Sequence, residues 1–449
     1  MWPNHGDVAG ALLTLRRGHG TSAGSREARA DYKVTWVHGV AAAFGGDFFI
    51  VFYMTVILLP MVSASMDASF LSPLTRLVGL KYHPCYLVSG VLPTLFSVEP
   101  KESLQDLFDR EDEVRKLREG LSRERLILVL GLRRIGKSSL VLATLSSTGH
   151  PFVYVDVRRA YDDVSRRVPA ERLYEELRSS LLRLSVRDRV LEALRRMGIS
   201  LEYPVKVRVP AEEVRDSIAK AFDALNELGR VAVVLDEAQY LRYSTVGLRP
   251  LLAHVYDRLR NVTLIMTGSE VGLLHDFIGI DDPSSPLYGR YGLTIELRPF
   301  DEERSRQFLR RGFEELGARV DERVIGRAVE ELDGVVGWLV YFGRLYLEKG
   351  ADAIDEVKEM GAKLVKRELE EALSRSPYYS HIMRAVATLG RARWKNVVDY
   401  VTAQLGRRVT NATIARDLRN LVKMGFIEKV NDEYRVADPI VRYAVLKGL

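Results

Sequence analysis

The sequence predicts an α/β protein built on a parallel sheet, followed by a helical segment and a small basic domain at the C-terminus. Three observations carry this prediction. A short apolar run, Arg125 to Val129, is followed by a glycine-rich loop and then by an apolar helix. A second apolar run, Val231 to Leu235, ends in two carboxylates. Residues 377–449 combine three helical patterns with one pair of short strand patterns.

Length and composition exclude several classes of protein. The chain has 449 residues, of which 47% are hydrophobic and 28% charged. These values are typical of a globular protein of about three domains and exclude collagen-like and wholly disordered chains. The single cysteine, Cys85, excludes a disulfide framework and a cysteine zinc cluster. The eight histidines include no pair three or four residues apart, so we predict no metal site built from histidines.

The first 94 residues differ from the rest. A stretch of 19 residues without a charge runs from Phe48 to Met66 and is long enough to cross a bilayer. Three interpretations stay open: an extension upstream of the natural start, a membrane anchor, or a folded part of the protein. We leave residues 1–94 without an assigned function.

The loop after the first apolar run has the pattern of a phosphate-binding loop. Residues Gly131 to Ser138 match G-x-x-x-x-G-K-[ST]. Glycines let backbone N–H groups turn toward a phosphate, and the start of the following helix adds a positive dipole. We expect Lys137 to reach the β and γ phosphates of ATP and the Ser138 hydroxyl to bind Mg²⁺.

Two carboxylates end the second apolar run. Before it, Val214, Ile218, Phe222 and Leu225 recur at helical spacing, and Gly229 ends that helix. Because Val231 to Leu235 is apolar on both faces, we predict a buried parallel strand with Asp236 and Glu237 at its carboxyl edge. There Asp236 would hold Mg²⁺, and Glu237 would polarise the attacking water.

Two further residues are weaker candidates for catalysis. A third apolar run, Val262 to Met266, is followed by Thr267, whose hydroxyl would contact the γ-phosphate or the attacking water, or else cap the next helix. Arg290 precedes the predicted strand Leu293 to Leu297. Arg290 is interpreted either as an arginine finger that stabilises the transferring phosphoryl group or as a surface arginine in a turn.

Residues from Leu95 onward resemble the archaeal P-loop ATPases of the AAA+/STAND type. The resemblance rests on the LQDLFDREDEV segment (104–114), the loop GLRRIGKSS, the strand VVLDEAQ, and the segments MTGSE, LYGR and RPFDEER. It implies an ATPase domain over 95–299, a helical lid over 300–376 and a winged-helix domain over 377–449, with 1–94 outside. Val336 stands where the lids of such proteins often have proline, in a Gly-x-Pro element. We assign the nucleotide contacts to Gly131, Arg133, Arg134, Gly136, Lys137, Ser138 and Ser139.

The C-terminal module is predicted to be a winged helix. Tyr379–Leu389 and Trp394–Leu405 are two helical patterns, and a third begins at Thr410 or Asn411 and ends at Gly425. A hairpin over Phe426–Val436 follows. Residues 377–449 hold 13 Lys and Arg against 6 Asp and Glu. The third helix would offer duplex DNA the side chains of Thr413, Arg416, Asn420 and Lys423.

The sequence therefore predicts a P-loop NTPase sheet with a helical lid and a C-terminal winged helix, with ATP and Mg²⁺ as cofactors. The leading hypothesis is a slow ATP-hydrolysing switch that the winged helix directs to DNA. The alternative is a regulatory or scaffolding protein that binds nucleotide mainly for structure and uses its winged helix to contact a protein partner. A homo-oligomer is a further possible assembly. We expect a cytoplasmic protein, because an ATP-using domain would find no ATP outside the cell. A membrane-tethered ATPase is a third possibility that rests on residues 48–66 alone.

Overall fold

The computed structural model describes residues 41–44, 47–50, 95–183, 187–196 and 211–448. The chain forms two compact units, Met1–Val88 and Ser89–Leu449. In the first unit, strands β1 (Ala41–Phe44) and β2 (Asp47–Ile50) pair antiparallel. Residues 51–66 of the apolar stretch, like Cys85, lie outside the described residues. Within the described ranges, no helix has both the length and the apolar composition needed to span a bilayer.

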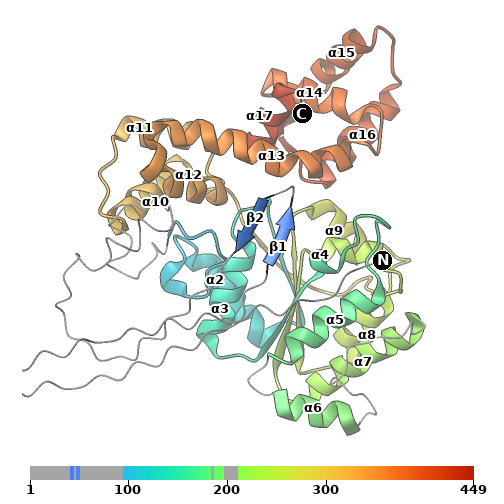
Figure 1. Cartoon of the computed structure of the whole chain (residues 1–449). Coiled ribbons are helices and arrows are strands. Elements are labelled where there is room, and N and C mark those ends of the chain that lie inside the picture. The colour runs from blue at the N-terminus through green and yellow to red at the C-terminus, as the bar shows by residue number, and fades with distance from the viewer. Residues whose placement is uncertain (1–40, 45–46, 51–94, 184–186, 197–210, 449) are drawn as a thin grey trace, which may run out of the picture. The chain divides into compact units, whose positions relative to one another are not determined.

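A five-stranded parallel sheet is the centre of the second unit, with strand order β4-β5-β6-β3-β7. Figure 1 shows the sheet between helices. The register sets Asp156 opposite Asp236 and Leu130 opposite Gly268, so the carboxyl ends of four strands meet at one edge. The four predicted strands are confirmed, and β4 at the sheet edge is an addition to them. The strands are β3 (Leu126–Leu130), β4 (Phe152–Asp156), β5 (Val231–Asp236), β6 (Val262–Gly268) and β7 (Leu293–Glu296).

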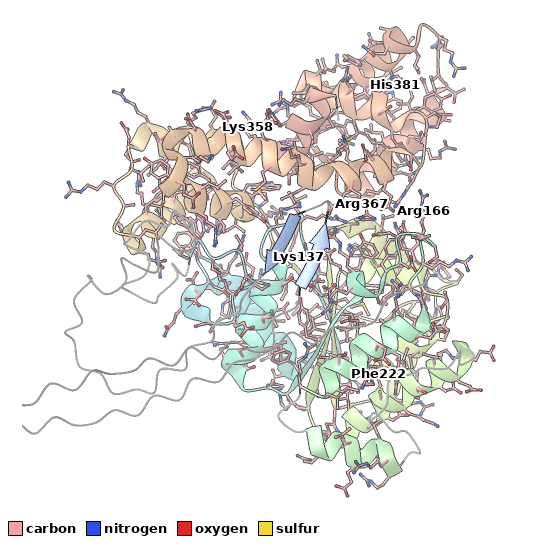
Figure 2. All side chains as sticks on the ribbon, viewed as in Figure 1. Lys137, Arg166, Phe222, Lys358, Arg367 and His381 are labelled. Atoms are coloured by element: carbon pink, nitrogen blue, oxygen red, sulfur yellow. The ribbon has the colours of Figure 1, made fainter. Side chains whose placement is uncertain are left out.

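Helices cover both faces of this sheet because its central strands are apolar on both sides. In β3, Leu128 faces the core that also contains Phe222, whereas Ile127 and Val129 face the core around Leu140. Phe222 is labelled in Figure 2. The predicted helix with Val214, Ile218, Phe222 and Leu225 on its buried face is confirmed. The elements are η3 (Leu104–Asp106), α2 (Glu111–Arg123), α3 (Lys137–Thr148), α4 (Val157–Ala160), α5 (Ala170–Leu181), α6 (Arg187–Arg196), α7 (Ala211–Glu227), η4 (Ala238–Tyr243), α8 (Arg249–Arg258) and α9 (Val271–Ile278).

Four helices form the lid, and the first described residues of the second unit belong to its core. The Phe96 ring packs edge-on against Phe308 and Phe313, with ring centroids 5.8 and 5.1 Å away. Gly312 and Gly343 leave room for this ring, since a Cβ at either position would lie 2.3 to 2.4 Å from it. The lid contains α10 (Glu302–Glu315), α11 (Glu322–Leu332), α12 (Val336–Lys349), η5 (Gly350–Asp352) and α13 (Ala353–Leu373).

The C-terminal residues form a winged helix, as predicted. Thr410 caps its third helix by accepting a hydrogen bond from the Thr413 N–H, and Asn431 and Asp432 make the hairpin turn with positive φ angles. A last helix, α17, follows the hairpin and packs on α13; the sequence patterns had not indicated it. The elements are α14 (Tyr379–Leu389), β8 (Ala392–Arg393), α15 (Trp394–Leu405), α16 (Asn411–Lys423), β9 (Ile427–Val430), β10 (Glu433–Val436) and α17 (Pro439–Lys447).

Candidate active site

The glycine-rich loop connects β3 to α3 with a backbone that only certain residues allow. Gly131 has a φ of 149°, and a Cβ there would lie 2.5 Å from the Leu297 carbonyl oxygen. Gly136 has a φ of 95° and directly precedes α3, which begins at Lys137. The loop therefore keeps the helix N-terminus and its free N–H groups at the edge where the strands end.

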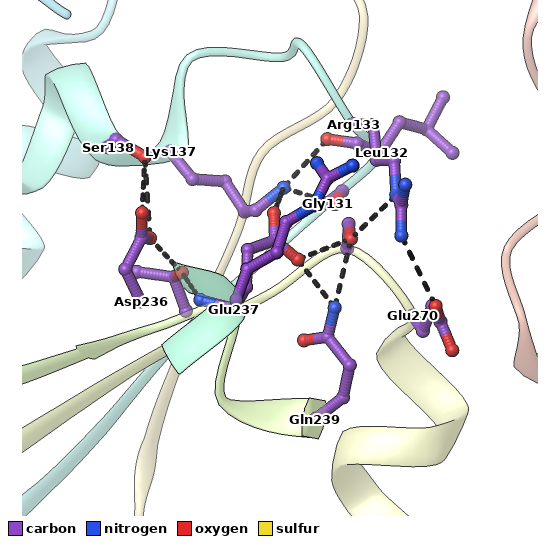
Figure 3. A network of polar contacts seen from close by, with 12 residues as sticks. Gly131, Leu132, Arg133, Lys137, Ser138, Asp236, Glu237, Gln239 and Glu270 are labelled. Carbon is purple, nitrogen blue, oxygen red and sulfur yellow. Dashed lines mark hydrogen bonds and ion pairs between the residues drawn. The ribbon is translucent and has the colours of Figure 1, made fainter. Parts of the chain in front are cut away.

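Lys137 lies inside this loop. Its Nζ donates to the carbonyl oxygens of Gly131 at 3.0 Å and Leu132 at 2.9 Å, and lies 3.9 Å from Glu237 Oε1 (Figure 3). Its side chain is only 5% exposed, and burial lowers the pKa of Lys137 while the charges of Glu237 and Asp236 oppose that shift. The ammonium group is thus bound by two backbone carbonyls and lies beside the Glu237 carboxylate.

Asp236 collects hydroxyl groups from three neighbouring elements. Ser138 Oγ, on the first turn of α3, donates to its carboxylate at 3.1 Å. Tyr154 on β4 donates to it at 2.5 Å, and Thr267 on β6 also donates to it. Carboxylate and hydroxyl oxygens are ligands that Mg²⁺ prefers, so the close pair of Ser138 and Asp236 fits a magnesium site.

Glu237 follows β5 in a strained conformation. Its φ of 51° is left-handed, and its N–H donates to Thr267 Oγ1 at 3.0 Å. Its Oε2 accepts hydrogen bonds from Gln239 Nε2 at 2.5 Å and from Ser269 Oγ at 2.6 Å. The carboxylate is therefore fixed by two neutral donors.

The charge state of Glu237 is set by opposing effects. Burial by itself raises the pKa of Glu237, but the charges of Lys137 and Arg133 and the two hydrogen bonds outweigh burial and lower it to about 2. Glu237 is consequently ionised throughout the physiological pH range. This is the charge state that a residue polarising a water molecule requires.

Gln239 and Ser269 are site residues that the sequence analysis did not single out. Gln239 is 1% exposed, and its Nε2 bridges Glu237 and Ser269, the latter at 3.2 Å. Its Oε1 is buried without a hydrogen-bond partner among the described residues. The available signal was their position: Gln239 lies two residues after Glu237, and Ser269 follows the strand that ends at Gly268.

Arg133 connects the loop to the lid. Its guanidinium contacts Ser269 Oγ at 3.3 Å and Glu270 Oε1 at 3.3 Å, and forms an ion pair with Glu368 on α13. Glu368 also accepts from Arg158 at 2.8 Å. One carboxylate of the lid thus holds an arginine of the loop and an arginine of α4.

Arg134 makes the second contact between the loop and the lid. Its carbonyl accepts from the Gly337 N–H at 2.9 Å, and its guanidinium lies 4.6 Å from the centroid of the Trp338 ring. Trp338 Nε1 in turn lies 3.1 Å from both carboxylate oxygens of Asp438, the residue that caps α17. The stretch with Val336 in place of proline therefore still meets the loop.

The other predicted nucleotide and catalytic residues have different surroundings. Ser139 Oγ accepts from the Lys101 N–H at 3.0 Å, which ties the segment before η3 to α3. Thr267 lies in the cluster around Asp236. Arg290 is instead paired with Asp257 of α8 at 2.6 and 2.9 Å, and its guanidinium lies 6.0 Å from the centroid of the Tyr256 ring.

The four candidate DNA contacts on α16 also differ from one another. Thr413 shares a hydrogen bond with Thr410 at 2.8 Å, and Asn420 donates to Tyr379 of α14 at 3.1 Å. Arg416 is 63% exposed and donates to Asp417 at 3.0 Å. Lys423 is bound to Asp276 of α9. Arg419, which the sequence analysis left out, is exposed.

Comparison with known proteins gives two family matches. Residues 107–342, more than half of the chain, match the family described as an ATPase domain predominantly from Archaea. Residues 373–437 match the MCM protein C-terminal winged helix-turn-helix domain. A search of the curated proteins gives no match.

Among solved structures, the chain is similar to the Walker-type ATPase PABY2304 of Pyrococcus abyssi. The two are 39% identical, the match covers 78% of this chain and 99% of that one, and the TM-score is 0.68. Cdc6p from Pyrobaculum aerophilum is 15% identical over 80% of this chain and 97% of that one, with a TM-score of 0.39. A RuvB variant of Thermotoga maritima is 14% identical over 76% and 96%, with a TM-score of 0.39.

Proposed function

The chain belongs to the family of ATPase domains found predominantly in Archaea, and from this premise we propose that it is a slow, Mg²⁺-dependent ATP-hydrolysing switch whose winged helix binds duplex DNA. The observation that carries the proposal is the convergence of Lys137, Ser138, Asp236 and Glu237 at one sheet edge. The proposal places the protein in the cytoplasm, where ATP is available.

The loop and the first turn of α3 bind the phosphates in this proposal. Backbone N–H groups between Gly131 and Ser139 cradle them, and Lys137 neutralises the β and γ phosphates. Ser138 and Asp236 hold Mg²⁺, which when bound supplies positive charge to the phosphate oxygens. Arg133 and Arg134 lie on the same loop and contact the lid, so they transmit the presence of nucleotide rather than only binding it.

Glu237 orients the attacking water and accepts its proton. Its Oε2 is occupied by Gln239 and Ser269, so at least one of these hydrogen bonds has to give way before Oε2 can contact water. Thr267, which touches both Asp236 and the Glu237 N–H, keeps the two carboxylates in a fixed relation. Because we assign the contact with water to Oε2, this rearrangement agrees with slow turnover.

The contacts between the loop, the lid and the winged helix support the proposed switch function. Arg134 contacts Trp338, and Trp338 donates a hydrogen bond to Asp438 of the winged helix. In this proposal, a change in the conformation of the loop therefore shifts the lid and, through it, the winged helix. Such a device is of the kind found in STAND ATPases. Arg290 acts as an arginine finger after leaving Asp257, either within its own chain or in a second copy.

DNA is the proposed partner of the winged helix because the winged helix has exposed arginines that can bind phosphates. Arg407, Arg408 and Arg419 are exposed and form no ion pair with any described residue. Residues 377–449 carry a net charge of +7, from 13 basic and 6 acidic side chains. A protein partner is the alternative occupant of this surface.

The test is steady-state ATP hydrolysis by the full chain, with and without duplex DNA. Lys137→Ala serves as the blank, and Lys116→Ala, an exposed lysine on α2, serves as the matched control. We expect Glu237→Gln to retain ATP binding while turnover falls about a hundredfold or more. We also expect DNA to raise the turnover of the parent severalfold. Turnover of the parent at the level of the blank would contradict the ATPase, and turnover without a response to DNA would favour a protein partner.

A further inference from the structure

The outward face of α16 is a stripe of positive charge. Ala412, Arg416, Arg419 and Lys423 follow one another at spacings of three and four residues, which places them on one side of the helix. The opposite side carries Ile414, Leu418 and Leu421 into the core of the winged helix. Three cations on one helix face suit the phosphates that border a DNA groove.

The C-terminal end of this stripe is in contact with α9 of the ATPase part. Lys423 Nζ lies 3.0 and 2.8 Å from the two carboxylate oxygens of Asp276. Gly272, in the first turn of α9, faces Lys423 so closely that an added Cβ would lie 2.7 Å from the Lys423 Cα. The two helices therefore touch through backbone as well as through an ion pair.

A DNA duplex cannot reach the C-terminal end of this face while α9 lies against Lys423. The major groove is about 12 Å wide, and a helix with its side chains is about 10–12 Å across, so a helix in the groove has no room for a second helix on its outward face. We propose that α9 and duplex DNA are mutually exclusive occupants of the outward face of α16, and that DNA releases the segment that restrains Glu237. This inference rests on the proposed function and names its regulation.

The restraint passes from α16 to Glu237 through one short segment. Gly425, two residues after Lys423, abuts Ser269, since a Cβ on Gly425 would lie 3.0 Å from the Ser269 carbonyl oxygen. Ser269 Oγ donates to Glu237 Oε2 at 2.6 Å. When α16 moves away from α9, the segment Ser269–Asp276 loses its contact with Gly425 at one end and its ion pair with Lys423 at the other. Ser269 can then move away, and Glu237 Oε2 can accept a hydrogen bond from water instead.

Three variants of the full chain test whether α9 and duplex DNA compete for the outward face of α16. Asp276→Ala removes the ion pair, Gly272→Ala places a methyl group against the backbone of α16, and both keep Lys423 for DNA. Lys423→Ala breaks the same ion pair but also removes a phosphate contact. Asp281→Ala is the matched control, because Asp281 is an exposed acid shortly after α9 and has no ion pair with any described residue.

Two quantities are measured for each variant: the Kd for a fluorescein-labelled duplex by anisotropy, and ATP turnover without DNA. Since Lys423 and Asp276 are 43% and 51% exposed, we expect Asp276→Ala to tighten DNA binding and raise turnover by about twofold to fivefold. Gly272→Ala should do both as well. Lys423→Ala should raise turnover without tightening DNA binding, and should lower the salt dependence of binding by about one phosphate contact. Asp281→Ala should match the parent.

The following outcomes would overturn the proposal. Unchanged DNA affinity in both Asp276→Ala and Gly272→Ala, with helical content retained in circular dichroism, would show that α9 does not compete with DNA. Tighter DNA binding with unchanged turnover would show that the contact does not restrain Glu237. Absence of duplex binding in the parent and in both variants would exclude DNA as the second occupant. A parent as inactive as Lys137→Ala would instead refute the ATPase, while the affinities would still decide the competition.

Discussion

The guanidinium of Arg134 lies 4.6 Å from the centroid of the Trp338 ring, so the phosphate-binding loop is in direct contact with the first turn of the lid helix α12. Trp338 is fully buried, and its Nε1 donates to Asp438 at the start of α17. These three residues come from three parts of the chain that are far apart in sequence. They provide a contact path from the loop to the winged helix where Val336 replaces proline.

Trp338→Phe should destabilise the chain by about 1–3 kcal/mol, because Asp438 would keep its buried charge with one donor fewer. The free energy of unfolding in urea measures this. Trp394→Phe is the control, since Trp394 is only partly buried and its indole makes no hydrogen bond to a described residue. Equal losses in the two variants would show that the hydrogen bond to Asp438 contributes nothing.

Asp438→Asn should change how stability depends on pH. Burial raises the pKa of Asp438, although Trp338, two backbone N–H groups and Arg134 act against it. The folded chain therefore keeps this proton to a higher pH than the unfolded chain, whose aspartate has a pKa of 3.8. The contribution of Asp438 to the free energy of unfolding is therefore fully present below pH 3.8 and is lost as the pH rises through the folded pKa.

Asparagine keeps one acceptor oxygen for the cap and for Trp338 but cannot ionise. The unfolding free energy of Asp438→Asn relative to the parent should therefore increase as the pH rises from 3.8, the unfolded value, through the folded pKa. Urea unfolding at several pH values measures it. A difference that stays constant with pH would mean that Asp438 titrates alike in both states.

Ser269→Ala should raise ATP turnover without DNA and make it insensitive to Asp276→Ala. The reason is that both changes act on one connection, the hydrogen bond from Ser269 to Glu237. The double variant should accordingly be no faster than Ser269→Ala alone. Ser217→Ala, a half-buried serine on α7, provides the comparison. Additive increases would place the two residues on separate routes.

Arg290→Ala should lower turnover about a thousandfold if Arg290 is an arginine finger, while ATP binding persists. Asp257→Ala breaks the same ion pair but frees the arginine, so its turnover should equal or exceed that of the parent. A surface arginine predicts the same small effect for both variants. Mixing Arg290→Ala with Glu237→Gln chains restores turnover only if the finger acts between chains.

Much of the fold could be predicted because it rests on local patterns. The apolar runs at β3, β5 and β6 exclude exposed strands, and the spacing of Ile414, Leu418 and Leu421 orients α16 in its core. Strand β4 was missed because only its alternate residues Val153 and Val155 are fully buried, as suits an edge. Helix α17 was missed although Asp438 and Pro439 are a helix start signal, and its packing against α13 could not be read from the sequence.

The sequence by itself determined the loop, the order of its chemistry-bearing residues and the carboxylate pair after β5. The conformation of a glycine-rich loop and the end of a strand depend mainly on neighbouring residues. Because parallel strands end at one edge of the sheet, the motif and its spacing suffice to place Lys137, Ser138, Asp236 and Glu237 together. Tertiary structure alone decided what holds them. Tyr154 and Ser269 joined the site through contacts between neighbouring strand ends, and Gln239 through its hydrogen bond to Ser269. Lys423 forms an ion pair with Asp276 of α9. Hydrogen bonds and ion pairs between distant segments depend on how helices pack, and packing is a property of the whole chain.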